Sequence, residues 1–355
     1  MAPERLSRRQ FLIRTGVGGT GLVLGPGLLA ACGADEPKPP ASGSPAPLEP
    51  LDVRFRTNWI PSVDFVGWYV GDDKGYFTEE AINIDILGAG YNSPESVQIL
   101  AGGKADVGLV TDVLTISDSN AQGTDFVIWG ARLQKSPFGL LSLAKNPINT
   151  PQDMVGKTLG GPEGDQTFLD AVLTINGLEA GAYDFVPIGF DSTPLVNGRV
   201  EGMTAYATNQ PLYLELDGID NVMVLFADMG MPSYADMLFA DRAYLKDNHD
   251  HMVGFLRATI RGWEFANASP ENTEYAVNLT LDKYGGTDAG QIHDQSLLNA
   301  QANIPLMESS TGMFSIDLDE LAGPMYDALR ASGRKNLPDP ETIVDLSILE
   351  EVNGG

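Results

Sequence analysis

The chain has 355 residues, with 22 Lys and Arg against 48 Asp and Glu, and a formal net charge of −26 at pH 7. We expect no nucleic-acid partner, because nucleic-acid affinity rests on basic side chains that displace counterions. Hydrophobic residues make up 43% of the chain, which is enough for the core of one large or two medium domains. The single cysteine, Cys32, excludes an internal disulfide, and with 3 histidines in the chain we expect no metal and no cofactor.

Residues 1–31 have the features of an export signal peptide. The sequence SRRQFL at residues 7–12 resembles a twin-arginine motif, and the uncharged residues 15–34 are so rich in glycine that they make a poor membrane span. Residues 16–21 also fit the pattern GxGxxG, but no strand precedes them, so we assign them no cofactor role.

The sequence LAAC at residues 29–32 resembles a bacterial lipobox. It predicts that Cys32 is acylated, becomes the mature N-terminus, and holds the protein at the outer face of the cytoplasmic membrane, at the cell surface or in the periplasm. The alternative is a free thiol behind an ordinary signal peptide. Removal of residues 1–31 takes away four Arg and one Glu, so the charge changes from −26 to −29 and the predicted anchor is lipid rather than a basic patch. Residues 32–50 are rich in proline and small residues, which predicts an extended tether.

From residue 51 onward, strand-like and helix-like segments alternate. We predict strands at residues 51–59, 82–87, 106–110 and 126–133, with helices at 65–80, 93–102 and 112–122. A second round has strands at 157–159, 184–188 and 202–205, with helices at 165–176 and just before Gly198. This order is typical of a mostly parallel sheet. The sequences GKADVG at 103–108 and GRVEGM at 198–203 occupy equivalent places in the two rounds, which predicts two lobes of similar build.

The C-terminal third is predicted to be mainly helical, with amphipathic runs at residues 250–268, 270–284 and 317–332. Two α/β lobes with a helical C-terminal region leave one natural ligand site. It is the cleft where the strand ends of both lobes face each other.

Several motifs carry a resemblance to a known family. They are NWIPS at residues 58–62, KGYF at 74–77, LAGGKADVG at 100–108, PQDMVGK at 151–157 and YATNQP at 206–211. Together they resemble the solute-binding proteins for thiamine pyrimidine precursors and riboflavin. That branch belongs to a wider group that includes binders of nitrate, taurine and alkanesulfonates. The resemblance covers about residues 52–285.

The resemblance implies an α/β protein with the type II periplasmic-binding-protein fold and two chain crossings between the lobes. Lobe 1 would comprise residues 51–134 and 238–355, and lobe 2 residues 135–237. It also implies delivery of a small molecule to an ABC permease and its ATPase, and we expect a monomer. Closure on the ligand is predicted to use hinges near residues 130–136 and 234–239.

The predicted cleft loops contain no Lys or Arg but several carboxylates, so we expect a neutral or cationic ligand. Trp59, Tyr91 and Tyr206 could stack on a flat heterocycle, and neighbouring amides and carboxylates could hydrogen-bond to its edge. The predicted ligand-binding set is Asn58, Trp59, Asp64, Tyr91, Asn92, Asp112, Glu163, Asp165, Tyr206, Asn209 and Gln210.

Structural alternatives exist for several of these residues. Trp59 and Tyr206 could be core residues at strand ends, and Asp64 and Asp112 could cap the helices that follow them. The glycine-rich residues 160–165 could let the backbone approach a ligand, or could form an ordinary turn between a strand and a helix.

Other functions remain open from the sequence. One is binding of a small anion such as an alkanesulfonate, taurine or nitrate, and another is ligand sensing without transport. A third is a pyrimidine-synthase-like enzyme, which by resemblance uses a histidine and a cysteine-rich segment. Phe65 occupies the position of a motif histidine, no cysteine follows Cys32, and His249, His251 and His293 are predicted to be solvated. We therefore expect no catalytic residue.

Overall fold

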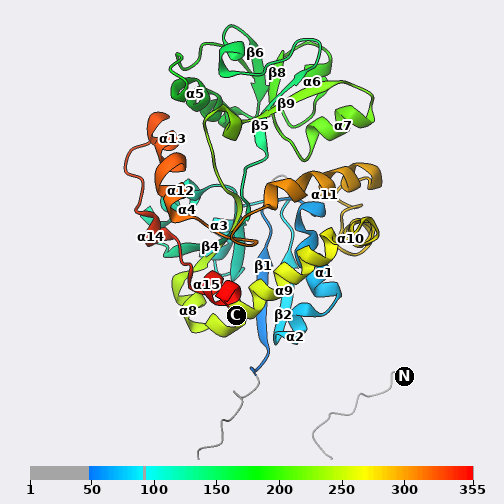
Figure 1. Ribbon diagram of the computed structural model, residues 1–355, viewed down its shortest axis with the longest axis vertical. Helices are drawn as coiled ribbons and strands as arrows, with labels where there is room; N and C mark the ends of the chain where they lie inside the picture. The colour runs from blue at the N-terminus through cyan, green and yellow to red at the C-terminus, as the bar shows by residue number, and fades with distance from the viewer. Residues whose placement is uncertain (1–47, 91–92, 355) are drawn as a thin grey trace, which may run out of the picture. The chain divides into compact units, whose positions relative to one another are not determined.

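A computed structural model describes residues 48–90 and 93–354 of the protein. The predicted signal peptide, Cys32, most of the predicted tether, Tyr91 and Asn92 lie outside the described residues. The strands of the described part form two five-stranded sheets with helices packed on them (Figure 1). Within those residues, no helix combines the length and apolar character that crossing a bilayer requires.

The first sheet contains the N-terminal strands and one strand that returns from later in the chain. Its order is β2 (Ile82–Leu87), β1 (Leu51–Arg56), β3 (Val107–Val110), β10 (Ala235–Asp241) and β4 (Phe126–Leu133). β1 runs parallel to β2 and β3, whereas β10 is antiparallel to β3 and β4. All residues of β4 are buried.

The second sheet is built entirely from residues 138–225. Its order is β7 (Asp184–Pro187), β6 (Thr158–Gly161), β8 (Gly202–Tyr206), β5 (Phe138–Leu143) and β9 (Asn221–Leu225). β6 runs parallel to β7 and β8, and β5 is antiparallel to β8 and β9.

The two sheets have the same order of strand directions, in agreement with the two rounds predicted from the sequence. GKADVG leads into β3 and GRVEGM leads into β8, and each of these strands lies at the centre of its sheet. The prediction of mostly parallel sheets is confirmed, because four of the five strands in each sheet run in one direction. The reversed strand is β10 in the first sheet and β5 in the second. Each of them directly follows a segment that connects the two sheets.

The helices occupy the faces and edges of both sheets. They are α1 (Val66–Asp73), α2 (Tyr76–Glu79), α3 (Ser96–Ala101), α4 (Val113–Ala121), α5 (Gln166–Ile175), α6 (Thr193–Val196), α7 (Gln210–Leu216), α8 (Arg242–Asp247), α9 (His249–Asn267), α10 (Pro270–Lys283), α11 (His293–Met307), α12 (Leu318–Glu320), α13 (Tyr326–Ala331), α14 (Pro340–Ile343) and α15 (Ser347–Gly354). The helix predicted at 65–80 is divided into α1 and α2 because Gly75 adopts a left-handed φ of 76°. The run predicted at 317–332 contains a π-helical turn, Leu321–Met325, which includes Pro324.

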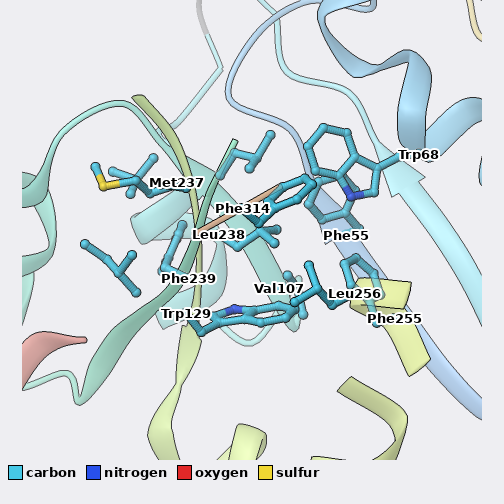
Figure 2. Packing of buried hydrophobic residues seen from close by; sticks show 14 of the residues in the cluster. Phe55, Trp68, Val107, Trp129, Met237, Leu238, Phe239, Phe255, Leu256 and Phe314 are labelled. Atoms are coloured by element: carbon cyan, nitrogen blue, oxygen red, sulfur yellow. The ribbon is translucent and has the colours of Figure 1, made fainter. Parts of the chain in front are cut away.

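The core of the first sheet is rich in aromatic side chains (Figure 2). The ring of Phe55 on β1 stacks on Trp68 of α1 at a centroid distance of 4.9 Å and contacts Phe255 of α9 at 5.7 Å. Helices α1 and α9 touch so closely that a Cβ on Gly262 would lie 1.9 Å from the carbonyl oxygen of Gly67. Burial of each of these rings stabilises the fold by about 2 to 3 kcal/mol. The loop that follows β1 therefore rests on a rigid base.

Two chain segments connect the sheets, residues 134–137 and residues 226–234. They lie side by side, because the amide of Ser136 donates to the carbonyl of Ser233 at 2.9 Å. Most of the predicted hinge ranges lie instead in the β4–β10 ladder, where Leu133 pairs with Ala235 and Gly130 with Leu238. Paired strands cannot absorb a large φ/ψ change, so the two connecting segments are better placed to act as hinges.

Candidate ligand-binding site

A cavity of about 870 Å³ lies between the two sheets, where loops from both of them meet. It is reached by the loops that follow β1, β3, β6 and β8, which are the carboxyl ends of the parallel strands. The predicted residues that line it are Asn58, Trp59, Asp64, Asp112, Asp165, Tyr206, Asn209 and Gln210. That these residues contact a ligand remains a prediction.

The other predicted residues are not placed at the cavity. Tyr91 and Asn92 lie outside the described residues, and Glu163 is exposed and is not among the lining residues. The glycines that precede it serve packing within the sheet. A Cβ on Gly161 would lie 2.3 Å from Thr204 Oγ1, and one on Gly160 would lie 2.6 Å from Ile188 Cδ1. This supports the interpretation of residues 160–165 as a closely packed strand-to-helix turn.

A buried arginine that the sequence analysis missed is among the residues that line the cavity. Arg132 is on β4 and is 1% exposed. Its Nε donates to Asp236 Oδ2 at 3.1 Å, its Nη2 forms an ion pair with the same oxygen, and its Nη1 donates to Asn303 Oδ1 at 3.0 Å. Asn58, from the loop after β1, donates to Asp236 Oδ1 at 2.7 Å. The cleft therefore contains a basic residue. The sequence analysis considered only the loops, which contain no Lys or Arg, and so overlooked an arginine on a strand.

Asp236 adopts an unusual backbone conformation. Its φ of 50° is in the left-handed region, which is uncommon for residues other than glycine. The residue lies within β10, directly opposite the end of β4, and pairs with a buried charge. Such strain is retained where surrounding contacts enforce it, and it often accompanies functional sites.

Asp64 belongs to the same polar network. Its carboxylate accepts hydrogen bonds from Asn303 Nδ2 at 3.0 Å and from Ser62 Oγ at 2.8 Å. Burial raises the pKa of Asp64, and the nearby charge of Arg132 and the two hydrogen bonds only partly oppose that effect. The alternative in which Asp64 caps the following helix is wrong. The cap of the one-turn helix Val63–Phe65 is Ser62, whose hydroxyl accepts from the Asp64 amide at 3.3 Å.

Asp165 and Tyr206 face the cavity from the second sheet. Thr204 Oγ1 donates to Asp165 Oδ2 at 2.6 Å, and burial raises the pKa of Asp165 above its usual value. Burial also raises the pKa of the Tyr206 hydroxyl, and the negative charges of Asp165, Asp236 and Asp112 raise it further. Tyr206 therefore stays protonated and can donate a hydrogen bond at physiological pH.

Asp112 and Gln210 have structural partners although both line the cavity. The Asp112 carboxylate accepts from the amide and the hydroxyl of Thr115, each at 3.0 Å, which confirms the predicted cap of α4. Gln210 Oε1 accepts from the backbone amide of Tyr206 at 2.9 Å and so fixes the end of β8 against α7. These bonds hold the cavity wall in place.

Aromatic rings line the cavity from both sheets. Phe138 lies 5.0 Å from Tyr206 and 5.2 Å from Phe168, measured between ring centroids. Trp59, from the loop after β1, meets Phe190 edge to face at a centroid distance of 5.5 Å. Trp59 is half-buried and packs against the first core as well as lining the cavity. That its ring stacks on a ligand remains a prediction.

The charge of the cavity is predominantly negative. Among the described lining residues, Arg132 is the single Lys or Arg, whereas the carboxylates are Asp64, Asp112, Asp165, Asp191, Asp217 and Asp236. Because Asp236 already pairs with Arg132, the remaining field favours a neutral or positively charged ligand. Over residues 48–90 and 93–354, no group of His, Cys, Asp and Glu side chains is arranged to hold a metal ion.

The fold and the cavity define a class of protein. The crystal structure of the periplasmic aliphatic sulphonate binding protein SsuA from Escherichia coli matches with a TM-score of 0.64 at 15% identity, over 84% of this chain and 92% of that chain. The protein thus has the periplasmic-binding-protein fold, with two α/β halves and a helical C-terminal region. The chain belongs to the NMT1/THI5-like family, whose model matches residues 62–273.

Proteins with similar sequences include some named as binding proteins and some named as synthases. The formylaminopyrimidine-binding protein of Halalkalibacterium halodurans is 25% identical over 275 residues, which is 75% of this chain and 80% of the relative. The riboflavin-binding protein RibY of Chloroflexus aurantiacus is 27% identical over 267 residues, or 72% and 74% of the two chains. A 4-amino-5-hydroxymethyl-2-methylpyrimidine phosphate synthase of Schizosaccharomyces pombe is 27% identical over 220 residues, or 58% and 63%.

Proposed function

We propose that the protein is the extracytoplasmic solute-binding component of an ABC importer and binds a small aromatic heterocycle between its two lobes. The observation that carries this proposal is the cavity itself, which combines aromatic rings from both sheets with an excess of carboxylates. Flat rings stack on such side chains, and amino groups on a ring edge are donors for carboxylates and amide oxygens. The two relatives named for a formylaminopyrimidine and for riboflavin support the same ligand class. The ligand would be neutral or cationic, such as a thiamine pyrimidine precursor or a riboflavin-like compound.

Binding of a small anion is the first alternative, and Arg132 is the observation that favours it. An alkanesulfonate, taurine or nitrate needs positive charge or several donors in the cleft. The guanidinium of Arg132, however, already binds Asp236 and Asn303. The other carboxylates of the cavity would repel an anion. We therefore rank the heterocycle above the anion.

A pyrimidine-synthase-like enzyme is the second alternative, and it is favoured by relatives that bear the name of such a synthase. The described histidines do not support catalysis at the cavity. His249 contacts Glu351, His251 contacts the carbonyl of Glu49, and His293 contacts Glu274 and Asp294, and no histidine is among the cavity's lining residues. Phe65, at the position of the motif histidine, is buried against Trp68 and Tyr69. Binding without turnover is the function that these contacts support best.

We further propose that residues 1–31 are removed, that Cys32 carries the lipid anchor, and that residues 32–50 tether the domain to the membrane. In this arrangement lobe 1 comprises residues 51–134 and 238–355, and lobe 2 comprises residues 135–237. The segments 134–137 and 226–234 would act as hinges, and the closed monomer would dock on the permease and its ATPase. Mass spectrometry of the membrane-extracted protein tests the anchor, and Cys32→Ala should release the protein from the membrane fraction.

A thermal-shift screen of residues 33–355 tests the ligand class. The panel contains 4-amino-5-hydroxymethyl-2-methylpyrimidine, thiamine and riboflavin, with taurine, an alkanesulfonate and nitrate as the contrasting set. A ligand present at 100 times its Kd adds about 2.7 kcal/mol to the free energy of unfolding, which is a readily measured rise in Tm. We expect stabilisation by one of the heterocycles. Stabilisation by anions alone would contradict the proposal, and consumption of a heterocycle would favour the enzyme.

A further inference from the structure

Phe190 is a large apolar side chain that the structure leaves 45% exposed at the cavity. Single exposed apolar residues are normal on protein surfaces, so exposure by itself says little. Phe190 differs in its position, because it lines the cavity from the loop between β7 and α6 and its ring contacts an aromatic residue of the opposite sheet. Nothing in the sequence motifs pointed to this residue.

The loop that carries Phe190 is held firmly on both sides. Before it, the amide of Ile188 donates to the carbonyl of Gly161 at 2.9 Å. After it, the carboxylate of Asp191 accepts from the amide of Thr193 at 2.9 Å and from its hydroxyl at 2.8 Å. The backbone is therefore fixed, while the ring lines the cavity and stays partly exposed. This is how a binding side chain is presented, because a fixed backbone reduces the entropy lost on binding.

The partner ring, Trp59, is positioned in a similar way from the first sheet. Its carbonyl accepts from Thr57 Oγ1 at 3.0 Å and from the amide of Ala89 at 3.0 Å. The rings of Trp59 and Phe190 meet at an interplanar angle of 76° with their centroids 5.5 Å apart. Each half of the molecule thus contributes one aromatic ring to a contact that crosses the cavity.

We propose that Phe190 and Trp59 form an aromatic clamp, in which Phe190 is a ligand-contacting residue that selects planar ligands. The inference rests on the proposed function. A flat ring between two stacked aromatic rings needs about 7 Å between their planes, twice the usual contact distance. The present edge-to-face contact has no such gap, so the rings must separate before a ligand enters and must flank it afterwards. Ligand release then requires the two lobes to part.

The clamp explains how the site selects planar ligands from other small molecules. A planar heterocycle contacts both rings over its whole area, whereas a short aliphatic chain fills only part of the gap. Loss of one ring should therefore act mainly on the dissociation rate constant, because release breaks these contacts and association does not.

The test compares dissociation of riboflavin and of 4-amino-5-hydroxymethyl-2-methylpyrimidine from the wild-type chain and from variants, by stopped-flow fluorescence. Phe190→Ala should raise the dissociation rate constant about tenfold, and Phe190→Leu should raise it less. The control is Val155→Ala, which truncates another exposed apolar residue, 47% exposed, away from the cavity. This variant should match the wild type, and circular dichroism should show all variants folded.

A second readout needs no ligand. The fluorescence of Trp59 is obtained by subtracting, from each spectrum, that of the matching chain with Trp59→Phe. Acrylamide should quench this fluorescence more strongly in Phe190→Ala than in the wild type, because the neighbouring ring is removed. If the wild type binds either heterocycle and Phe190→Ala releases it at the same rate, the clamp is overturned and the proposed function stands. If the wild type binds none of the heterocycles in the thermal-shift panel, the proposed function fails and the clamp fails with it. Unchanged quenching would overturn the contact itself.

Discussion

Arg132 and Asp236 form an ion pair whose partners depend strongly on each other. Arg132 is almost completely buried, and removal of one member of a buried pair leaves the other charge without compensation. We expect Arg132→Met to lower the free energy of unfolding by about 3 kcal/mol. The double variant Arg132→Met, Asp236→Asn should lose less, because no buried charge is left unpaired. Urea denaturation measures both, and equal losses would contradict the pairing.

The ionised carboxylate of Asp165 should lower the free energy of unfolding at neutral pH. Burial raises its pKa, so its ionisation above that pKa is unfavourable in the folded state, and the penalty disappears as pH falls through the raised value. Asp165→Asn should therefore increase the free energy of unfolding at pH 7, with a smaller gain near pH 4.

Asp191 provides the matched control at the same cavity. Hydrogen bonds from the amide and the hydroxyl of Thr193 lower the pKa of Asp191, so its carboxylate stabilises the fold above the unfolded pKa and that contribution is lost as pH falls. Asp191→Asn should therefore decrease stability at pH 7. Urea titrations of the two variants at both pH values check the opposite signs, and a decrease in both variants would contradict the assignment of Asp165.

Trp59 should supply much of the affinity if its ring stacks on the ligand. Trp59→Ala should weaken binding by about 1 to 3 kcal/mol, as aromatic anchors in binding sites do. Trp59→Phe should retain most of the affinity because a flat ring remains. Isothermal titration with the best heterocycle of the screen measures both variants. Unchanged affinity in Trp59→Ala would mean that Trp59 does not stack on the ligand and only packs against the first core.

Among the elements, helix α11 illustrates where sequence patterns fail. Four of its six buried residues are polar, namely Gln295, Ser296, Asn299 and Asn303, so it has no continuous apolar stripe from which a helix can be predicted. The same polar face brings Asn303 between Arg132 and Asp64. The polar side chains that α11 contributes to the cavity network therefore remove the apolar pattern by which the helix could have been predicted.

The hydrogen bonds of Asn303 to Arg132 and Asp64 should contribute to the free energy of unfolding. Asn303→Ala leaves Arg132 and Asp64 each short of one hydrogen bond, which should cost about 2 to 3 kcal/mol of stability. Gln301→Ala, on the exposed side of the same helix, should change stability by less than about 0.5 kcal/mol. Chemical denaturation of both variants measures the difference. Equal effects would mean that Asn303 acts only through helix propensity.

The strands and the site were predictable to different degrees. Strands 82–87 and 126–133 were predicted with the observed bounds, because their apolar residues and flanking turns are clear. β5, β9 and β10 were missed, and β5 and β10 enter their sheets only after a chain crossing, which local patterns do not encode. Loop residues such as Asp165 were found because they follow strands. Arg132 lies inside a strand, and its one available signal was a lone charge in the apolar run FVIWGARL.

At the scale of the whole molecule, the acidic excess should make stability depend on salt. The net charge of −26 produces self-repulsion in the compact state, and added salt screens it. Surface ion pairs such as Lys135 with Asp228 lose strength in salt, but exposed pairs contribute little. We expect Tm to rise by several degrees between low salt and 0.3 M NaCl, as measured by scanning calorimetry. A fall in Tm would mean that ion pairs outweigh repulsion.

The order in which the strands enter the two sheets also governs how the chain can fold during its synthesis. All strands of the second sheet lie within residues 138–225. The first sheet is complete only when β10 has been synthesised, because β10 lies between β3 and β4. Until residue 241 has emerged, the edges of β3 and β4 that pair with β10 in the folded sheet remain open to pairing with other chains. A nascent or truncated chain that stops earlier is therefore at risk of aggregation, although most of the strands that form its sheets are already present.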